Sequence, residues 1–376
     1  MAGIYIHIPF CKTRCIYCDF YSTTRSELRR PYIHALCTEL RERKAYLEGE
    51  PVETIYLGGG TPSQLASEDF GQIFHTIQEV YGLEHAVEIT LEANPDDLTE
   101  KYVSMLRTHP FNRISMGIQT FDDPTLRLLN RRHNAAQAVE AVERCRRAGF
   151  GNLSIDLIYG LPGETDGRWE RDLQQAVALG VEHLSAYHLP YEEGTRLYEM
   201  LQEHSVSEVD EESSVRFFTT LMDTLGAAGY EHYEISNFCK PGLHSRHNSA
   251  YWKGIPYLGC GPSAHSFNRK AREWNTASLE QYIRSVEAGH RLCETEELDR
   301  VTRYNEYLMT ALRTRWGVSL QRVEEAFGTK LHHYCTAMAA PYLKSHKLEI
   351  QDGRLRLTRQ GIFVSDGIIS DLMFIE

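Results

Sequence analysis

Short apolar runs alternate with longer amphipathic segments through the first two-thirds of the chain. The apolar runs are rich in β-branched and aromatic residues, as buried parallel strands are. They predict strands at residues 3–8, 53–57, 86–91, 113–118, 153–158 and 183–187. The amphipathic segments repeat apolar residues at helical spacing. They predict helices near residues 26–47, 67–81, 99–107, 135–148, 168–179 and 210–228.

Strand–helix units that follow one another in this way predict a parallel sheet with helices on its outside. Gly149, Gly180 and Gly229 stand where three of the helices should end, which supports the boundaries. Six units are too few to close the eight-unit barrel of the TIM type. We therefore predict an α/β fold with an open, partial (β/α)6 barrel.

The pattern changes from about residue 236 onward, where helical segments dominate. Helices are predicted at residues 278–288, 297–314, 319–327 and 330–346. Two short strand-like runs follow at 347–351 and 354–358, with Asp352-Gly353 as a hairpin turn between them.

Two domains follow from this change of pattern. We predict a barrel domain at 1–235 and a mainly helical C-terminal domain at 236–376, winged-helix-like from about residue 297. Winged helices often bind DNA, but this one offers few clustered basic residues. A packing or protein-contact role is therefore favoured for it.

Composition narrows the function classes. The chain has 376 residues, of which 42% are hydrophobic and 24% charged, as in an ordinary globular protein. A formal net charge of −12 disfavours a general role in nucleic-acid binding. No apolar stretch approaches the roughly 20 residues that span a bilayer, and no export signal is recognisable. We predict a cytoplasmic protein.

Three cysteines carry the most specific chemical signal in the chain. Cys11, Cys15 and Cys18 follow the first predicted strand with the spacing C-x-x-x-C-x-x-C. Three thiolates on one loop can bind three irons of a four-iron cluster and leave the fourth iron open for chemistry. The alternative is a zinc site with His7 or Asp19 as fourth ligand. Structural zinc typically uses a second, distant cysteine pair, and the other cysteines here are scattered singly.

Other unusual residues fall at the ends of the predicted strands. They include Gly58-Gly59-Gly60-Thr61-Pro62, Glu92, Gln119 and Tyr187-His188, and Asp156 lies in the strand predicted at 153–158, with Tyr159-Gly160-Leu161-Pro162-Gly163 after it. Because the carboxyl ends of parallel strands meet at one edge of a barrel, we expect these residues to form a common site with the cysteines. Two alternatives stay open on the residues alone. The glycines suit a tight turn as well as a close ligand approach, and Arg131 with Asp156 suits a structural ion pair.

The segment 245–252 combines His247 with an amide and two aromatic residues, Tyr251 and Trp252. An imidazole can bind heme iron, and aromatic rings can flank a macrocycle. On the residues alone, a satisfied structural histidine beside an aromatic anchor is the favoured interpretation.

Several long motifs resemble one known family. The segments 5–11, 56–62, 113–121 and 154–163, together with the cysteine spacing, resemble radical S-adenosylmethionine (radical SAM) proteins of the HemN/HemW group. The resemblance runs nearly end to end. It implies a [4Fe–4S] cluster on Cys11, Cys15 and Cys18, whose open iron binds S-adenosylmethionine. An electron from a donor such as a flavodoxin would then yield a 5′-deoxyadenosyl radical.

The resemblance also implies which residues contact S-adenosylmethionine. These are Tyr5, Tyr17, Gly59, Gly60, Thr61, Glu92, Gln119, Arg131 and Asp156.

The group contains two functional classes, both linked to porphyrin metabolism. One is an oxygen-independent coproporphyrinogen III oxidase, which decarboxylates propionates of a porphyrinogen. The other is a heme chaperone that binds heme and delivers it to respiratory cytochromes. Whether the chain is an enzyme stays open at this point, and no catalytic residue is assigned.

Three features favour the heme chaperone. Phe20 stands where the oxidases carry a further cysteine, and only ten residues precede Cys11. The segment from His247 to Trp252 matches the HNxxYW element associated with heme binding. The resemblance thus predicts His247 as a heme-binding residue, with the oxidase as the alternative.

Overall fold

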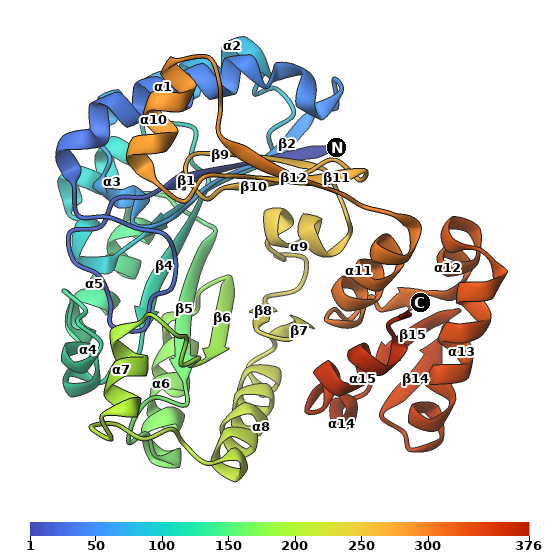
Figure 1. The fold of residues 1–376 in the computed structure, drawn as a ribbon. Helices are drawn as coiled ribbons and strands as arrows, with labels where there is room; N and C mark the ends of the chain where they lie inside the picture. The colour runs from blue at the N-terminus through green and yellow to red at the C-terminus, as the bar shows by residue number, and fades with distance from the viewer. Residues whose placement is uncertain (376) are drawn as a thin grey trace.

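The computed structural model describes residues 1–375. Its central feature is a run of parallel strands joined by helices, as predicted (Figure 1). The strands are β1 (Ala2–Ile8), β2 (Val52–Gly59), β3 (Glu88–Ala93), β4 (Arg113–Gln119), β5 (Leu153–Tyr159) and β6 (His183–His188). Neighbouring strands pair in chain order from β1 to β6, each parallel to the next. The open, partial barrel is confirmed.

Helices cover the outside of this barrel. The predicted ones are α1 (Arg29–Glu42), α2 (Ser67–Val80), α3 (Glu100–Leu106), α5 (Ala135–Arg147), α6 (Asp166–Leu179) and α8 (Glu211–Ala227). Two short helices of the barrel were not predicted, α4 (Asp123–Leu128) and α7 (Arg196–Gln202). Each is under two full turns long and depends on its N-cap, Asp122 or Thr195, more than on an apolar face.

The barrel strands separate apolar and polar side chains onto opposite faces. On β4, Ile114, Met116 and Ile118 are buried against the outer helices. Arg113 and Ser115 alternate with them and lie on the other face, because successive side chains of a strand point to opposite sides. The interior of the barrel is therefore lined by polar groups, an arrangement typical of a binding site.

The sheet continues on both sides of the barrel. Within residues 1–375 it comprises twelve strands in the order β12-β11-β10-β9-β1-β2-β3-β4-β5-β6-β8-β7. The added strands are β7 (Glu231–Glu234), β8 (Asn237–Cys239), β9 (Tyr257–Cys260), β10 (His265–Phe267), β11 (Ala271–Asn275) and β12 (Cys293–Glu297). Helices α9 (Arg246–Trp252) and α10 (Leu279–Glu287) lie between them.

This sheet crosses the boundary that the sequence predicts at residue 235. Strand β9 pairs in parallel with β1, so residues far apart in the chain are neighbours at the barrel edge. The short strands β7 to β12 were not predicted, because each has at most five residues. The hydrophobic cores divide the chain later, near residue 300.

The C-terminal part has its own hydrophobic core. It contains α11 (Arg300–Leu312), β13 (Val318–Ser319), α12 (Leu320–Phe327), α13 (Thr329–Lys344), β14 (Leu348–Gln351), β15 (Arg354–Leu357), α14 (Arg359–Ile362) and α15 (Ser365–Leu372). The predicted turn is present, since Asp352 and Gly353 both have positive φ, as the tight turn of a hairpin requires. A membrane-spanning helix is not found anywhere in residues 1–375.

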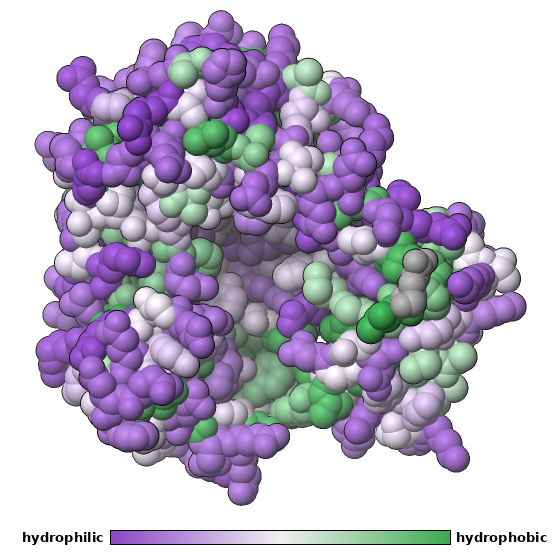
Figure 2. Space-filling view, viewed as in Figure 1, coloured by the Kyte–Doolittle hydropathy of each residue, from purple (hydrophilic) through white to green (hydrophobic). Residues whose placement is uncertain are grey.

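The two parts of the molecule enclose a hollow. In Figure 1 the helices from α11 onward lie beside the barrel, with α9 and the β7–β8 hairpin between them. The space-filling view in Figure 2 shows the surface deeply hollowed between the barrel and this C-terminal part.

Candidate functional site at the carboxyl ends of the barrel strands

The cysteine loop lies directly after β1 and is held at its base by backbone hydrogen bonds. The amide of Cys11 donates to the carbonyl of Thr23 at 2.9 Å, and that of Thr23 donates to the carbonyl of Pro9 at 2.7 Å. Farther along, the Asn130 side chain donates to the carbonyl of Arg14 at 2.8 Å. The loop is thereby fixed to the segment after β4.

The three thiols are partly exposed and near enough to influence one another. Burial is the main cause that raises the pKa of Cys18 to about 11, and the charges of Cys15 and Cys11 act in the same direction. Burial likewise raises the pKa of Cys11, although the Thr61 hydroxyl donates to its sulfur at 3.3 Å. Free of metal, Cys11 and Cys18 are protonated at neutral pH. Iron binding would release these protons, as metal binding to thiols does.

The spacing of the sulfurs bears on the zinc alternative. Among the residues that the structure describes, Cys11, Cys15 and Cys18 do not form a group whose donor atoms all lie within 4.8 Å of one another. One tetrahedral zinc ion needs its ligands closer than this. The arrangement of the three sulfurs therefore does not favour one zinc ion bound by all of them.

The glycines after β2 are required by the packing of the backbone itself. Gly59 has a φ of +104°, and its amide donates to Glu92 at 3.1 Å. A Cβ on Gly60 would lie 2.7 Å from the carbonyl oxygen of Ile8. The tight-turn interpretation therefore has a direct structural basis, and the same turn brings Thr61 to the Cys11 sulfur.

Two buried carboxylates lie inside the barrel near its mouth. Glu92 accepts hydrogen bonds from the Tyr56 hydroxyl at 2.6 Å and from the Gly59 amide. Burial raises the pKa of Glu92 to about 7, and the nearby charge of Asp156 adds to the shift. Burial also raises the pKa of Asp156 to about 6, against hydrogen bonding from Ser185. Shifted carboxylates of this kind are typical of ligand sites.

Gln119 and Arg131 meet at the end of β4. Gln119 has a φ of +74° at a break in the β4–β5 register. That region of backbone space is costly for a residue other than glycine and is found preferentially at functional sites. Arg131 donates to the Cys15 sulfur at 3.2 Å, to the Asn94 side chain at 2.7 Å and to the carbonyl of Gly117.

The ion pair considered between Arg131 and Asp156 is not formed as a direct contact among residues 1–375, where the guanidinium instead binds Cys15, Asn94 and Gly117. Its charge still reaches Asp156 and lowers the pKa of that carboxyl, in opposition to burial. Arg131 thus contacts the cysteine loop, as a residue of the same site would.

Both tyrosines of the candidate set lie near the mouth. The Tyr5 hydroxyl forms a 3.1 Å hydrogen bond with Nδ1 of His7, whose Nε2 in turn binds the carbonyl of Tyr21. Tyr17 packs in a small apolar cluster with Leu129 at the end of the cysteine loop. Burial raises the pKa of each tyrosine hydroxyl, so both stay neutral.

His247 lies apart from this mouth, at the opposite end of the barrel. It is 1% exposed, and both of its ring nitrogens have partners. Nδ1 lies 2.8 Å from the hydroxyl of Thr54 and Nε2 lies 2.8 Å from that of Tyr251. The ring stacks on Tyr56 at 5.1 Å between centroids. Burial lowers the pKa of His247 to about 3, so the imidazole is neutral.

Sequence reasoning missed Asp97, which organises the surroundings of the cysteine loop. Its carboxylate binds Lys12 of that loop at 3.0 Å, Arg132 at 3.0 Å and the side chains of Ser63 and Gln64. These partners come from the loops after β1, β2 and β4. The clue in the sequence was Asp96-Asp97 after Asn94-Pro95, but an acidic pair after a proline is common in ordinary turns.

Comparison with known proteins relates both parts of the chain to one family. Residues 5–176 match the family model of the Radical SAM superfamily, and residues 298–364 match the HemN C-terminal domain. A protein named Heme chaperone HemW from Mycobacterium tuberculosis is 33% identical over 99% of this chain and 94% of its own. A protein of the same name from Bacillus subtilis is 33% identical over 96% of each chain. The chain belongs to the HemW family of radical SAM proteins.

A solved structure agrees with the fold of this HemW family member. The coproporphyrinogen III oxidase HemN from Escherichia coli, a radical SAM enzyme, superimposes with a TM-score of 0.85. The match covers 99% of this chain and 90% of that chain, at 22% identity, and it shows a shared fold. Membership of the radical SAM superfamily implies a [4Fe–4S] cluster and S-adenosylmethionine as cofactors, as expected from the sequence.

Proposed function

We propose that this chain is a heme chaperone that carries a [4Fe–4S] cluster on Cys11, Cys15 and Cys18 and binds S-adenosylmethionine beside it. The observation that carries this proposal is the end-to-end similarity, at 33% identity, to proteins named heme chaperones. The identity to the oxidase is lower, at 22%. Phe20, which stands where the oxidases carry a further cysteine, supports the same choice.

The residues of the mouth fit these cofactors by their chemistry. The cysteines offer three thiolate ligands, and Arg131 offers a positive charge against one of them. Glu92 and Asp156 are carboxylates able to accept hydrogen bonds from an amine or from ribose hydroxyls. When bound, the cluster and S-adenosylmethionine supply one-electron chemistry at the mouth. We propose Tyr5, Tyr17, Gly59, Gly60, Thr61 and Gln119 as further contacts.

His247 is proposed as the heme-binding residue, and its surroundings define what binding requires. A neutral imidazole is the form that binds iron, and the low pKa of His247 keeps it in that form. Both ring nitrogens are occupied, however, by Thr54 and Tyr251. Iron at Nε2 therefore requires the Tyr251 hydroxyl to leave, which a rearrangement of α9 would allow.

A heme titration followed by absorption spectroscopy tests this assignment. We expect one heme per wild-type chain and at least a tenfold loss of affinity in His247→Ala. His265→Ala is the matched control, because His265 is an exposed histidine stacked on Trp274. Unchanged heme uptake by His247→Ala would overturn the residue assignment. Absence of heme binding by the wild-type protein would overturn the chaperone proposal.

The second candidate function is the oxygen-independent oxidation of coproporphyrinogen III. The observation in its favour is the mouth itself, in which Glu92, Arg131 and Asp156 all accompany the cysteine loop. An anaerobic assay with reductant and S-adenosylmethionine separates the two functions. Formation of protoporphyrinogen IX would establish the oxidase, and its absence alongside heme binding would favour the chaperone.

Two kinds of protein partner belong to this proposal, an electron donor such as a flavodoxin and heme-accepting respiratory proteins. Phe20 supports a donor contact near the cluster, since its side chain is 63% exposed two residues after Cys18. Apolar side chains this exposed often mark contact sites. Slower cluster reduction by flavodoxin in Phe20→Ser, with unchanged reduction by dithionite, would support the contact. Equal rates with flavodoxin would argue against it.

A further inference from the structure

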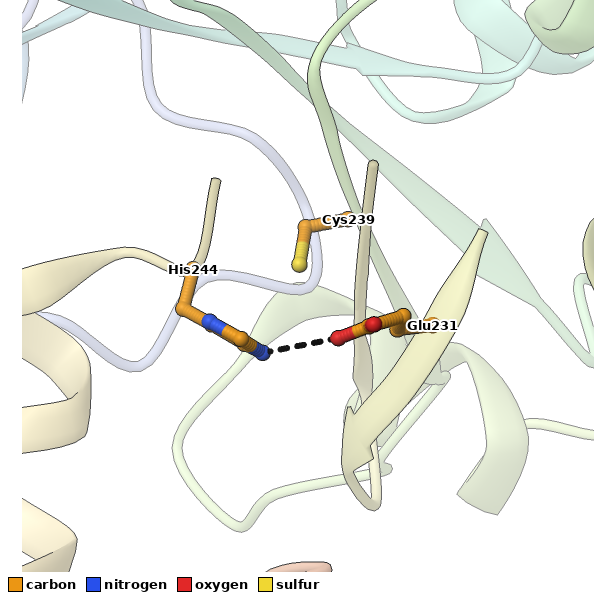
Figure 3. A group of neighbouring side chains, drawn as sticks. All are labelled: Glu231, Cys239 and His244. Atoms are coloured by element: carbon orange, nitrogen blue, oxygen red, sulfur yellow. Dashed lines mark ion pairs between the residues drawn. The ribbon is translucent and has the colours of Figure 1, made fainter. Parts of the chain in front are cut away.

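Three metal-binding side chains converge far from the cysteine loop. Glu231 is on β7, Cys239 is the last residue of β8, and His244 lies in the segment between β8 and α9. Figure 3 shows the three side chains pointing toward one another from these elements. One donor atom of each lies within 4.8 Å of the other two. The β7–β8 hairpin and the start of α9 thus bring a carboxylate, a thiol and an imidazole together.

The imidazole nitrogen in this group has Glu231 as its one near partner, in a poorly aligned contact. Nε2 of His244 lies 3.2 Å from a carboxylate oxygen of Glu231, but the atom is buried and forms no well-aligned hydrogen bond. A buried nitrogen without an aligned hydrogen bond is unfavourable. A bound ion would satisfy it, because the neutral imidazole can present its lone pair to a metal.

The separations suit one small ion of zinc type. Tetrahedral zinc with bonds of 2.0–2.3 Å holds its ligand atoms roughly 3.3–3.8 Å apart. The Glu231–His244 contact, at 3.2 Å, is just below that range. Cys239 lies within 4.8 Å of both other donor atoms and needs to approach by roughly 1 Å. Thiolate and imidazole donors together favour Zn²⁺ over Mg²⁺ or Ca²⁺, which prefer oxygen ligands.

The surroundings supply outer contacts and an entry route. Arg315 donates to the Glu231 carboxylate at 2.8 Å, as outer partners commonly do for metal-binding carboxylates. His244 packs edge-on against Tyr233, 4.7 Å between centroids. It also lines a cavity of about 320 Å³ with Trp316 and Lys253, through which an ion can enter. One thiolate and one carboxylate balance the two positive charges of the ion. Arg315 and Lys253 would therefore lie near a centre with no net charge.

We propose that Glu231, Cys239 and His244 bind a Zn²⁺ ion, with water at the fourth position. Binding releases the Cys239 proton to solvent, and the thiolate becomes a metal ligand. The ion would tie the β7–β8 hairpin to the segment that leads into α9. Through Arg315 it would also contact the C-terminal part, so its role is to fix this junction. The proposal does not depend on heme binding.

The test uses the full chain with its iron–sulfur cluster reconstituted, so that the loop cysteines are occupied. Zn²⁺ is titrated by calorimetry, and Co²⁺ is used as an absorbing substitute. We expect one ion per chain and a thiolate-to-cobalt charge-transfer band. Cys239→Ala should abolish the band, and His244→Gln should weaken binding at least tenfold. Cys145→Ala is the matched control, because both thiols are fully buried and burial raises each pKa to about 12.

Two results would overturn the proposal. One is identical Zn²⁺ binding by wild-type protein and Cys239→Ala, and the other is bound Co²⁺ without the thiolate band. A loss of binding in Cys145→Ala as well would attribute the effect to general destabilisation and would equally count against the site. Iron, sulfide and heme are measured on the same samples, so failure here is distinguishable from failure of the chaperone proposal.

Discussion

The two ends of the barrel treat their polar groups in opposite ways. At the mouth, Cys11 and Cys18 are partly exposed thiols with raised pKa values, and Gln119 holds a costly backbone conformation. At the α9 end, His247 is enclosed and both ring nitrogens have partners. The mouth thus combines a strained backbone with partly exposed thiols, and both favour the binding of a cofactor there. The imidazole of His247, by contrast, has both of its hydrogen-bond partners within the protein and needs no ligand to satisfy it.

The two ends are nevertheless joined by an aromatic stack. The ring of Tyr5 lies 6.2 Å from that of Tyr56, and Tyr56 lies 5.1 Å from His247. Tyr56 also donates to Glu92 at the mouth. If heme binding moved His247, the movement would therefore be transmitted through Tyr56 to Glu92, a candidate contact of S-adenosylmethionine.

The largest effect is expected from the cysteine loop. Cys15→Ser should reduce iron and sulfide after anaerobic reconstitution to near background, because a four-iron cluster needs all three thiolates. The exposed Cys293→Ser is the control and should retain the full content. Iron and sulfide assays provide the measurement. Full iron and sulfide content in Cys15→Ser would contradict the assignment of the cluster to the cysteine loop at the mouth.

Glu92 predicts a pH dependence of stability for the cofactor-free chain. Its pKa is about 7 in the folded protein against an ordinary value of 4.5, so the folded state holds its proton longer than the unfolded state. Stability from this group is present below pH 4.5 and is lost as pH rises to about 7, by about 3 kcal/mol in all. Glu92→Gln removes the ionisation and should raise the melting temperature at pH 8 but not at pH 4.5.

The matched variant for this prediction is Glu88→Gln on the same strand. The Glu88 carboxylate accepts the backbone amides of Arg246 and His247, so its loss should lower stability at pH 8. Opposite signs for the two glutamates would support the contrast between the ends of the barrel. An equal drop in both variants would contradict it.

A smaller effect is expected at the turn after β2. Gly60→Ala places a methyl group 2.7 Å from the Ile8 carbonyl oxygen and 2.9 Å from the Pro9 carbonyl carbon, both backbone atoms that lead into the cysteine loop. Overpacking of this kind costs about 2 kcal/mol. The free energy of unfolding, measured by chemical denaturation, should fall, and so should the iron content after reconstitution. Gly71→Ala is the control, since its Cβ meets nothing within 4 Å in α2 and should stabilise by about 1 kcal/mol.

The sequence predicted the elements correctly where the spacing of apolar residues followed a single pattern, that of a buried strand or of an amphipathic helix. The strands β1 to β6 and their main helices were predicted because apolar runs and helical spacing reflect burial directly. The strands β9 to β12 were not predicted, since β12 is exposed at every position and β11 is only half buried. They join the barrel through β9, whose pairing with β1 is a contact between residues distant in the chain.

The residues of the candidate site also fall into two groups, those that the local pattern predicts and those that depend on distant contacts. Glu92 and Gln119 lie at the carboxyl ends of β3 and β4 and Asp156 lies within β5, positions that the local strand pattern was enough to predict. The role of Asp97 and the enclosure of His247 follow from partners dozens of residues away, such as Thr54 and Arg132. No spacing within a motif encodes such contacts.

The smallest predicted effect sharpens the contrast at the α9 end. Thr54→Val removes the hydroxyl beside Nδ1 of His247 and leaves a buried nitrogen unpaired, which costs about 1 kcal/mol. Thr90→Val on the adjacent strand is a close control, because the Thr90 hydroxyl is also buried but has no hydrogen-bond partner. We expect denaturant unfolding to show a loss for the first and none for the second. If both variants were equally stable, the hydrogen bonds of His247 would contribute little, and its release to heme would need no compensation.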